Sequence, residues 1–299
     1  MRSFFFSVLL LLIYFSPVQA FDDDSRDDTR PEILNTLCEN NQIINDTPTL
    51  KSSCRGDIVN LQNRNTTLVK NGKTITQSPV LDFKVSRNGK VFYRTRTGPY
   101  LFDESGKLRS LGRAVIIYLV SANDDIVYLN NQGIVFKNGK SLNQNKGRVS
   151  FHEQEISTPL QKLFFAPKLA VTTNGQAVYI NDKGLLFVDR IAMSPRTARV
   201  IKFRVDSQAT VYYLDDLGRL YIDRAKVFQK AVRVKDFKIN IQSQIAYLTA
   251  GTSENLYFEG HNLSAGSHRI LSFSFTGAGE VIYKDDIGRV WKMGQLISD

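Results

Sequence analysis

The stretch from Val211 to Ile222 reads VYYLDDLGRLYI. Two runs of β-branched and aromatic residues flank the four residues DDLG, and this pattern is typical of a β-hairpin. Glycine adopts the left-handed backbone that closes such a turn without strain, and aspartate in a turn accepts hydrogen bonds from backbone amides. We therefore predict two antiparallel strands joined by a tight turn over residues 215–218.

The same pattern recurs along the chain. An apolar residue stands ten positions before each Tyr of a recurring apolar doublet or triplet, and Gly usually follows five positions after that Tyr. The Tyr residues of the pattern are Tyr93, Tyr128, Tyr179, Tyr213, Tyr247 and Tyr283. A weaker first copy lacks the Tyr, but its residues 57–73 are similar to residues 125–140. The seven copies start at residues 50, 83, 118, 169, 203, 237 and 273, so we predict seven structural repeats.

Each copy of about 34 residues has room for three or four short strands and none for a helix. A sheet this small cannot bury both faces alone, whereas radial stacking of seven sheets buries them and removes most exposed edges. We predict an all-β fold, a seven-bladed β-propeller of short blades over residues 50–299. The chain resembles β-propellers in its repeat alone, without a WD, kelch or Asp-box signature. A seven-fold β-solenoid is the alternative.

Residues 1–20 have the features of a secretory signal peptide. A positive start at Arg2 precedes the apolar run from Phe4 to Tyr14, and small residues lead to a cleavage site after Ala20. The apolar run is shorter than the roughly 20 residues that span a membrane. We predict a secreted or periplasmic protein with no membrane span after signal removal, and an uncut signal anchor is the alternative.

The segment over residues 21–49 is predicted to close the ring. Its acidic beginning, residues 21–30, is expected to be disordered. Residues 41–49 stand at the offset of an outer strand that the last copy lacks, so we expect Ile43 and Ile44 to complete the last blade. Their neighbours there would be Leu296 and Ile297.

Cys38 and Cys54 are the only cysteines of the chain. An oxidising compartment favours their pairing, so we predict a structural disulfide between them. The insertion over residues 141–167 lies between the third and fourth copies and contains Phe164 and Phe165. These two residues are a candidate contact for a partner; the alternative is that they cover the edge of a blade.

In a propeller, the turns between second and third strands share one face with the connections between blades. Loops on a rigid scaffold are where recognition residues concentrate, so we place the candidate site on this face. The candidate ligand-binding residues are Arg94, Arg96, Asn130, Asn131, Asn181, Asp182, Asp215, Asp216, Asp285 and Asp286. The alternative is that these residues only form turns. Calcium binding at Asp215 and Asp216 or at Asp285 and Asp286 is a further alternative, but two adjacent aspartates do not supply the six or more oxygen ligands of calcium, so we predict no metal. We also predict no cofactor.

The chain has 39 Lys and Arg against 29 Asp and Glu, a formal net charge of +10. These cations are spread through the turns, whereas nucleic-acid binding favours a basic stripe or a stacking platform, so we expect no nucleic-acid partner. A basic exported surface favours an acidic protein, an anionic glycan or an envelope polymer.

These observations favour a non-catalytic propeller that binds a protein or glycan through its loop-rich face, as a monomer or as part of a complex. No triad or nucleophile motif is present, and no catalytic residue is predicted. One alternative is a glycan hydrolase or lyase with its site at the mouth of the central channel. Another is a scaffold in an envelope complex, with Phe164 and Phe165 at the interface.

Overall fold

The computed structural model describes residues 50–62, 67–110, 113–149, 152–155, 162–165, 168–226, 232–251, 254–264 and 269–298. Within these ranges every regular element is a β-strand, and no helix long and apolar enough to cross a membrane occurs. The strands form seven sheets in chain order, with one additional hairpin between the third and fourth sheets.

Six of the seven sheets have four strands, and the second has three. The first sheet contains β1 (Leu50–Ser52), β2 (Ile58–Gln62), β3 (Thr67–Lys70) and β4 (Lys73–Thr76). The second contains β5 (Val80–Val85), β6 (Val91–Thr95) and β7 (Leu101–Asp103). The third contains β8 (Val115–Val120), β9 (Ile126–Asn130), β10 (Val135–Lys137) and β11 (Lys140–Ser141). The hairpin consists of β12 (His152–Glu155) and β13 (Lys162–Phe165).

The last four sheets follow the same order. The fourth contains β14 (Leu169–Val171), β15 (Ala177–Ile180), β16 (Leu186–Val188) and β17 (Ile191–Ala192). The fifth contains β18 (Val200–Val205), β19 (Val211–Asp215), β20 (Leu220–Ile222) and β21 (Ala225–Lys226). The sixth contains β22 (Val234–Ile239), β23 (Ile245–Thr249), β24 (Leu256–Phe258) and β25 (His261–Asn262). The seventh contains β26 (Ile270–Phe275), β27 (Val281–Asp285), β28 (Val290–Lys292) and β29 (Gln295–Ser298).

The recurring Tyr of the second strand stacks on an aromatic residue of the third strand. Tyr213 lies directly opposite Tyr221 in the register of the sheet, with ring centroids 4.7 Å apart and rings 9° from parallel. Five further sheets have an equivalent stack: Tyr93–Phe102, Tyr128–Phe136, Tyr179–Phe187, Tyr247–Tyr257 and Tyr283–Trp291. The sequence period therefore corresponds to one sheet per repeat, as predicted.

A polar residue begins the turn between the first and second strands of every sheet. In the fifth sheet, Oδ1 of Asp206 accepts a hydrogen bond from the amide of Thr210 at 2.8 Å. The weak first copy has the same bond, from the amide of Asp57 to Oγ of Ser53 at 3.1 Å. The residues at this position are Ser53, Ser86, Ser121, Thr172, Asp206, Asn240 and Thr276. This shared bond shows that the first copy is a true member of the repeat.

The hydrophobic core lies between the sheets. Among the described residues, buried apolar side chains form six clusters, and each cluster joins two consecutive sheets. The cluster between the fourth and fifth sheets, for example, packs Val178 and Leu186 against Phe203 and Tyr213. Face-to-face packing of this kind is what the propeller prediction requires, because each small sheet buries its surfaces only against its neighbours.

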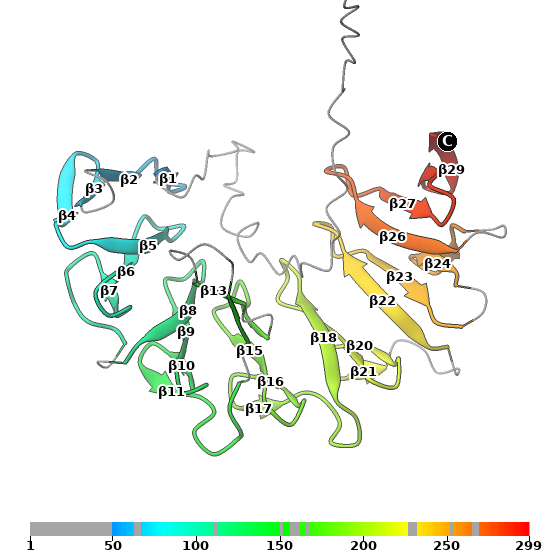
Figure 1. The fold of residues 1–299 in the computed structure, drawn as a ribbon, viewed down its shortest axis with the longest axis horizontal. Coiled ribbons are helices and arrows are strands. Elements are labelled where there is room, and N and C mark those ends of the chain that lie inside the picture. Colours follow the sequence, from blue (N-terminus) through cyan, green and yellow to red (C-terminus); the bar gives the residue numbers. More distant parts are fainter. Residues whose placement is uncertain are drawn as a thin grey trace, which may run out of the picture.

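Figure 1 shows the sheets following one another along an arc, with the first and last sheets at its two ends. In the first sheet β1 lies on the inner side of the arc and β4 on the outer side, and β26 and β29 are arranged alike at the other end. This is the radial arrangement of a seven-bladed β-propeller, which confirms the predicted fold class.

Closure of the ring by the N-terminal segment stays a prediction, because Ile43 and Ile44 lie outside the described residues. The last sheet already has its fourth strand, β29, in which Leu296 pairs with Trp291. The expected gap in the last blade is therefore absent, and a segment pairing there would add a fifth strand. The disulfide also stays a prediction, because Cys38 lies outside the described residues.

The insertion lies just before β14, the first strand of the fourth sheet. Val149 occupies the repeat position at which the first strand of the fifth sheet begins, and the insertion separates Val149 from β14. Ser141 belongs to β11, and the amide of Val149 donates to the carbonyl of Gly133, as the regular connections do. The extra residues therefore lie between Val149 and Lys168, a shorter range than 141–167. Phe164 and Phe165 are on β13, opposite Glu153 and His152 of β12. Their side chains lie outside the described part of the structure, so their contact role stays a prediction.

Candidate functional site

The turns between second and third strands lie against the connections that lead into the sheets. The amide of Asp216 donates to the carbonyl of Arg199 at 2.8 Å, and the amide of Asp286 donates to that of Arg269 at 2.9 Å. Equivalent bonds join Arg96 to Pro79, Asn131 to Ala114, Asp182 to Arg148 and Ala250 to Arg233. The turns and connections thus share one face, which we call the connection face. The other ends of the strands form the opposite face.

Four of the predicted ligand-binding residues begin these turns and are buried. They are Asn130, Asn181, Asp215 and Asp285, with exposed fractions of 0%, 2%, 1% and 1%. In each, Oδ1 accepts hydrogen bonds from the backbone amides two and four residues further along, at 2.8–3.2 Å. These side chains form the turns and leave almost no surface for a ligand.

Two of these four are also paired with arginine. Oδ2 of Asp285 accepts hydrogen bonds from Nε of Arg289 at 2.8 Å and Nε1 of Trp291 at 3.0 Å. Burial alone would raise the pKa of Asp285, but the hydrogen bonds from Trp291 and Arg289 outweigh burial and lower the pKa to about 2. Asp215 accepts a similar bond from Nε of Arg219 at 2.6 Å. Both carboxylates are thus engaged within their own turns.

The second residue of each turn is on the surface. Asn131, Asp182, Asp216 and Asp286 are exposed, and Oδ1 of Asp216 accepts a hydrogen bond from the amide of Arg199 at 3.1 Å. These residues belong to the third, fourth, fifth and seventh sheets, so they are distributed along the arc rather than gathered (Figure 1). Within the described ranges, no three His, Cys, Asp or Glu side chains are grouped so that they could hold a metal ion.

Arg94 joins two sheets, and Arg96 is exposed beside it. Nε of Arg94 donates to Asp82 at 2.9 Å, and Nη1 donates to the carbonyls of Val115 at 2.8 Å and Ile116 at 2.6 Å. Burial alone would lower the pKa of Arg94, but the bond to Asp82 outweighs burial and raises the pKa. Arg94 is therefore a structural link between the second and third sheets.

A set of arginines that was not predicted from the sequence occupies one repeated position of the connection face. Each precedes the buried Val or Ile at which a connection enters a sheet, and each is exposed. We call these residues the arginine row: Arg148, Arg199, Arg233 and Arg269. Nε of Arg269 lies 3.4 Å from a carboxylate oxygen of Glu254, and its side chain stays 64% exposed. The structure records no ion pair between the other three guanidinium groups and any described residue.

For Arg148, Arg199 and Arg233, the glycine of the preceding turn makes room for the arginine. The amide of Val234 donates to the carbonyl of Gly218 at 2.8 Å, and a Cβ on Gly218 would lie 3.2 Å from Cβ of Arg233. At Gly133 the corresponding distance to Cβ of Arg148 would be 3.0 Å. The repeated glycine thus serves the contact between neighbouring sheets as well as its own turn.

The arginine row has a sequence signal. The dipeptide Arg-Val or Arg-Ile occurs at 148–149, 199–200, 233–234 and 269–270, each time just before a first strand or, at 148–149, before the insertion that interrupts it. The connection into the third sheet has an exposed arginine one residue earlier, at Arg113. Aligning the repeats on the connections instead of on the Tyr residues would have revealed this position.

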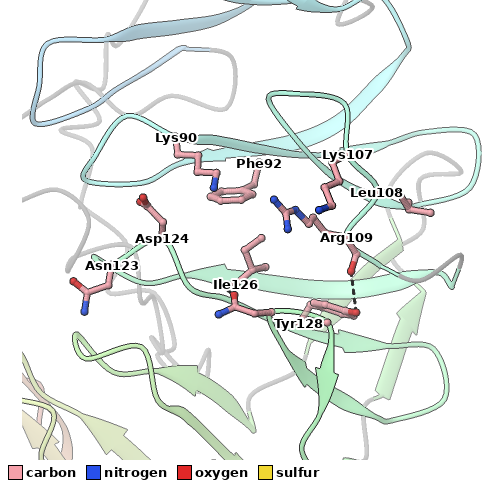
Figure 2. Close-up of a pocket in the computed structure, with 11 residues that line it drawn as sticks. Lys90, Phe92, Lys107, Leu108, Arg109, Asn123, Asp124, Ile126 and Tyr128 are labelled. Atoms are coloured by element: carbon pink, nitrogen blue, oxygen red, sulfur yellow. Dashed lines mark hydrogen bonds between the residues drawn. The ribbon is translucent and has the colours of Figure 1, made fainter.

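A cavity of about 510 Å³ lies on the opposite face, between the second and third sheets (Figure 2). Its cationic lining residues are Lys90, Lys107 and Arg109, and Asp124 approaches from the third sheet. Its apolar lining residues are Phe92, Leu108, Ile126 and Tyr128. In Figure 2 the hydroxyl of Tyr128 donates to the carbonyl of Arg109, at 3.1 Å, which links the two walls. None of these residues was a candidate site residue in the sequence analysis, where only Tyr128 appears, as part of the repeat.

No family model and no curated protein matches the chain. Among solved structures, virginiamycin B lyase from Staphylococcus aureus with quinupristin is 10% identical, with a TM-score of 0.32 over 82% of this chain and 93% of that one. YCF48 bound to D1 peptide is 9% identical, with a TM-score of 0.37 over 86% and 95%. YCF48 from Cyanidioschyzon merolae is 11% identical, with a TM-score of 0.34 over 83% and 96%. At TM-scores below 0.5, these likenesses carry no argument about the function of this chain.

Proposed function

We propose that this chain is an exported, non-catalytic β-propeller that binds an acidic segment of a partner protein through the arginine row. The observation that supports the proposal is the recurrence of an exposed arginine at one position in four consecutive connections. The backbone of each is held by hydrogen bonds to the neighbouring turns, so that the charges are presented on a fixed scaffold.

The chemistry of arginine suits a carboxylate-rich partner. A guanidinium group offers a planar set of donors that matches a carboxylate with two parallel hydrogen bonds. The same turns expose apolar side chains at Leu217 and Ile287, which are 51% and 61% exposed. Charge with adjacent apolar surface is a composition found at protein interfaces, so these residues add contact area beside the arginines.

An anionic glycan is the competing ligand for the same face. A glycan hydrolase or lyase is the alternative function. Catalysis would need free carboxylates or histidines in one cleft, whereas Asp215 and Asp285 are bound to arginines within their own turns. Export rests on the signal-peptide pattern of residues 1–20 and is part of the proposal.

The test compares the double charge reversal Arg199→Glu/Arg233→Glu with the unchanged protein, using a fluorescent oligo-glutamate peptide as the probe. We expect the affinity to fall at least about tenfold, because each exposed ion pair contributes up to about 1 kcal/mol and reversal adds repulsion. Binding by the unchanged protein should also weaken as salt rises.

The matched control is Lys73→Glu/Arg224→Glu, which changes the net charge equally at exposed positions of the opposite face, at the start of β4 and in the turn before β21. We expect this control to retain most of the affinity. Equal losses in both double variants would show that net charge alone attracts the probe and would overturn the proposal. Binding of polygalacturonate in preference to the peptide would assign the face to a glycan.

A further inference from the structure

The cavity between the second and third sheets exists because the second repeat departs from the pattern. In the third, fourth and fifth sheets a two-residue turn joins the third strand to the fourth, whereas the second sheet has three strands followed by a longer loop. Asp103 organises this loop. It is 2% exposed, and its Oδ1 accepts hydrogen bonds from the amides of Ser105 and Lys107, both at 3.0 Å. The cavity wall is therefore held by a buried carboxylate.

Asp103 also positions a guanidinium group in the cavity wall. Its Oδ2 accepts a hydrogen bond from Nε of Arg109 at 2.9 Å. Burial alone would raise the pKa of Asp103, but hydrogen bonds from Ser105 and Arg109 outweigh burial and lower the pKa. Arg109 is thus oriented toward the cavity before any ligand arrives (Figure 2).

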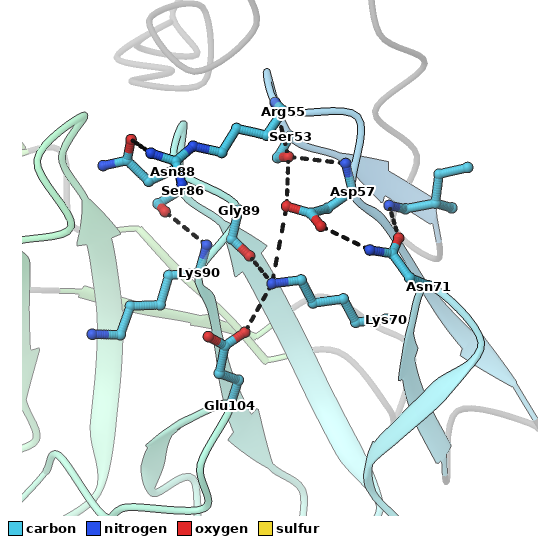
Figure 3. Close-up of polar contacts among 11 residues, drawn as sticks. Ser53, Arg55, Asp57, Lys70, Asn71, Ser86, Asn88, Gly89, Lys90 and Glu104 are labelled. Atoms are coloured by element: carbon cyan, nitrogen blue, oxygen red, sulfur yellow. Dashed lines mark hydrogen bonds and ion pairs between the residues drawn. The ribbon is translucent and has the colours of Figure 1, made fainter.

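Two ammonium groups of the cavity have no charged partner among the described residues. Nζ of Lys90 lies 5.5 Å from the centroid of the Phe92 ring, and no hydrogen bond or ion pair is recorded for it or for Nζ of Lys107. Figure 3 shows the contrast with nearby Lys70, whose Nζ donates to the carbonyl of Gly89 at 2.6 Å and to Glu104 at 3.2 Å. Lys90 and Lys107 therefore present two ammonium groups to the cavity that have no ion-pair partner among the described residues.

The carboxylate of Asp124 adds a hydrogen-bond acceptor to the cavity wall that the third sheet forms. Its Oδ1 is buried and has no hydrogen-bond partner among the described residues. The φ of Asp124 is +63°. The equivalent positions of the other six repeats also have positive φ: four are glycine (Gly56, Gly89, Gly175 and Gly279) and two are Ala209 and Ser243. A buried carboxylate oxygen without a donor is costly, and the left-handed backbone is unfavourable for a residue with a side chain. The unpartnered oxygen points to a donor that a ligand supplies, whereas the left-handed backbone belongs to this turn in every repeat.

We infer that this cavity binds a small carboxylate that bears a hydroxyl or amino group. The anionic group would face Lys90, Lys107 and Arg109, and the donor group would reach the open side of the Asp124 carboxylate, beside its buried Oδ1. The volume of about 510 Å³ is large enough to admit a monosaccharide or an amino acid. A sugar acid and an amino acid are two sources of this one chemistry.

The test is calorimetric titration of the purified protein with D-glucuronate and L-glutamate, which represent the two sources. Acetate supplies the anion without the donor, and methyl glucoside supplies hydroxyl donors without the anion. We expect one of the first two ligands to bind at least tenfold more tightly than acetate and methyl glucoside, because only it satisfies both walls.

Asp124→Gly removes the unpartnered carboxylate and installs the residue that four repeats already have, so the variant should fold and melt no lower than the unchanged protein. We expect it to weaken binding of the preferred ligand at least tenfold, to the level of acetate. Lys107→Gln should weaken binding several-fold, and Lys73→Gln, at the same turn of the first sheet, should not.

Three results would overturn the inference. They are equal binding of acetate and the preferred ligand, unchanged binding by Asp124→Gly, and the absence of measurable heat with both glucuronate and glutamate at millimolar concentration. The arginine row lies on the other face, so Arg199→Glu/Arg233→Glu should leave this binding intact. The proposal for the arginine row and the proposal for the cavity can therefore be refuted separately.

Discussion

At the scale of single residues, the polar side chains of the turns divide into two groups. Those at the first position, such as Asp285, are buried and hold the turn together, whereas those at the second position, such as Asp286, are exposed. Two adjacent aspartates thus have different roles. The first accepts hydrogen bonds from the backbone amides of the turn, and the second faces the solvent. Stability should depend on the first residue and surface chemistry on the second.

Asp285→Asn should destabilise the protein at neutral pH, because the amide replaces an ionised acceptor of Arg289 and Trp291. The folded pKa of about 2 lies below the ordinary value of 3.8, so the ionised form stabilises the fold above about pH 4 and this contribution is lost as pH falls toward 2. Urea unfolding at several pH values measures this contribution. Between pH 4 and pH 2 the free energy of unfolding should fall less steeply in Asp285→Asn than in the unchanged protein.

Asp286→Asn is the control for this prediction, since it changes the same charge one residue away on the surface. We expect its unfolding midpoint to stay within a small margin of the unchanged protein at all pH values. If the free energy of unfolding falls equally between pH 4 and pH 2 in the unchanged protein and in Asp285→Asn, the assigned role is wrong.

At the scale of the element, each turn between second and third strands is the point where the next repeat is attached. The amide of Val200 donates to the carbonyl of Gly184 at 2.8 Å, and a Cβ at Gly184 would lie only 2.8 Å from Cβ of Arg199. The turn therefore fixes both its own hairpin and the connection that displays the arginine row. Packing between repeats, rather than the hairpin alone, determines where these arginines lie.

Gly133→Ala should reveal this second role. Its φ is +73°, and the added Cβ would lie 2.8 Å from the carbonyl oxygen of Val149. Gly106→Ala is the matched variant, because Gly106 has φ +76° and no atom within 4 Å of an added Cβ. Both should lose about 1 kcal/mol through backbone strain, and Gly133→Ala about 1–3 kcal/mol more through the clash. Equal unfolding free energies in denaturant would refute the contact.

The sequence period predicted the number of repeats, the strands and the face on which turns and connections meet. The prediction succeeded because it rests on local patterns, such as Tyr213 opposite Tyr221 and the Gly that ends most of the turns. The arginine row and the cavity were not predicted, because they depend on which residues of neighbouring repeats come together. Asp103 and Asp124 belong to different repeats, and only the packing of the second sheet on the third brings their surroundings to one cavity.

At the scale of the whole molecule, the described residues form six hydrophobic clusters that join the seven sheets in sequence, and the first and last sheets lie at the ends of the arc (Figure 1). The outer strand of the last sheet exposes Leu296 and Ile297, at 43% and 58%. If residues 41–49 close the ring as the sequence predicts, these side chains are covered by Ile43 and Ile44.

Ile297→Asp tests closure against Ile191→Asp, since both residues are 58% exposed and lie on fourth strands. With closure, Ile297→Asp should lose about 2 kcal/mol more unfolding free energy, because it places a charge against buried isoleucines. Chemical denaturation of both variants measures the difference. Equal losses in the two variants would contradict closure by the N-terminal segment.

The function proposed here depends on the connection face being the surface that meets an acidic partner. The most direct measurement places a photo-reactive amino acid at Leu217 on the connection face and, separately, at Arg224 on the opposite face, and irradiates each variant with the oligo-glutamate peptide. We predict a covalent adduct through position 217 that disappears in the Arg199→Glu/Arg233→Glu background, and little adduct through position 224. An adduct through position 224 alone, or one through 217 that survives the charge reversal, would contradict the account.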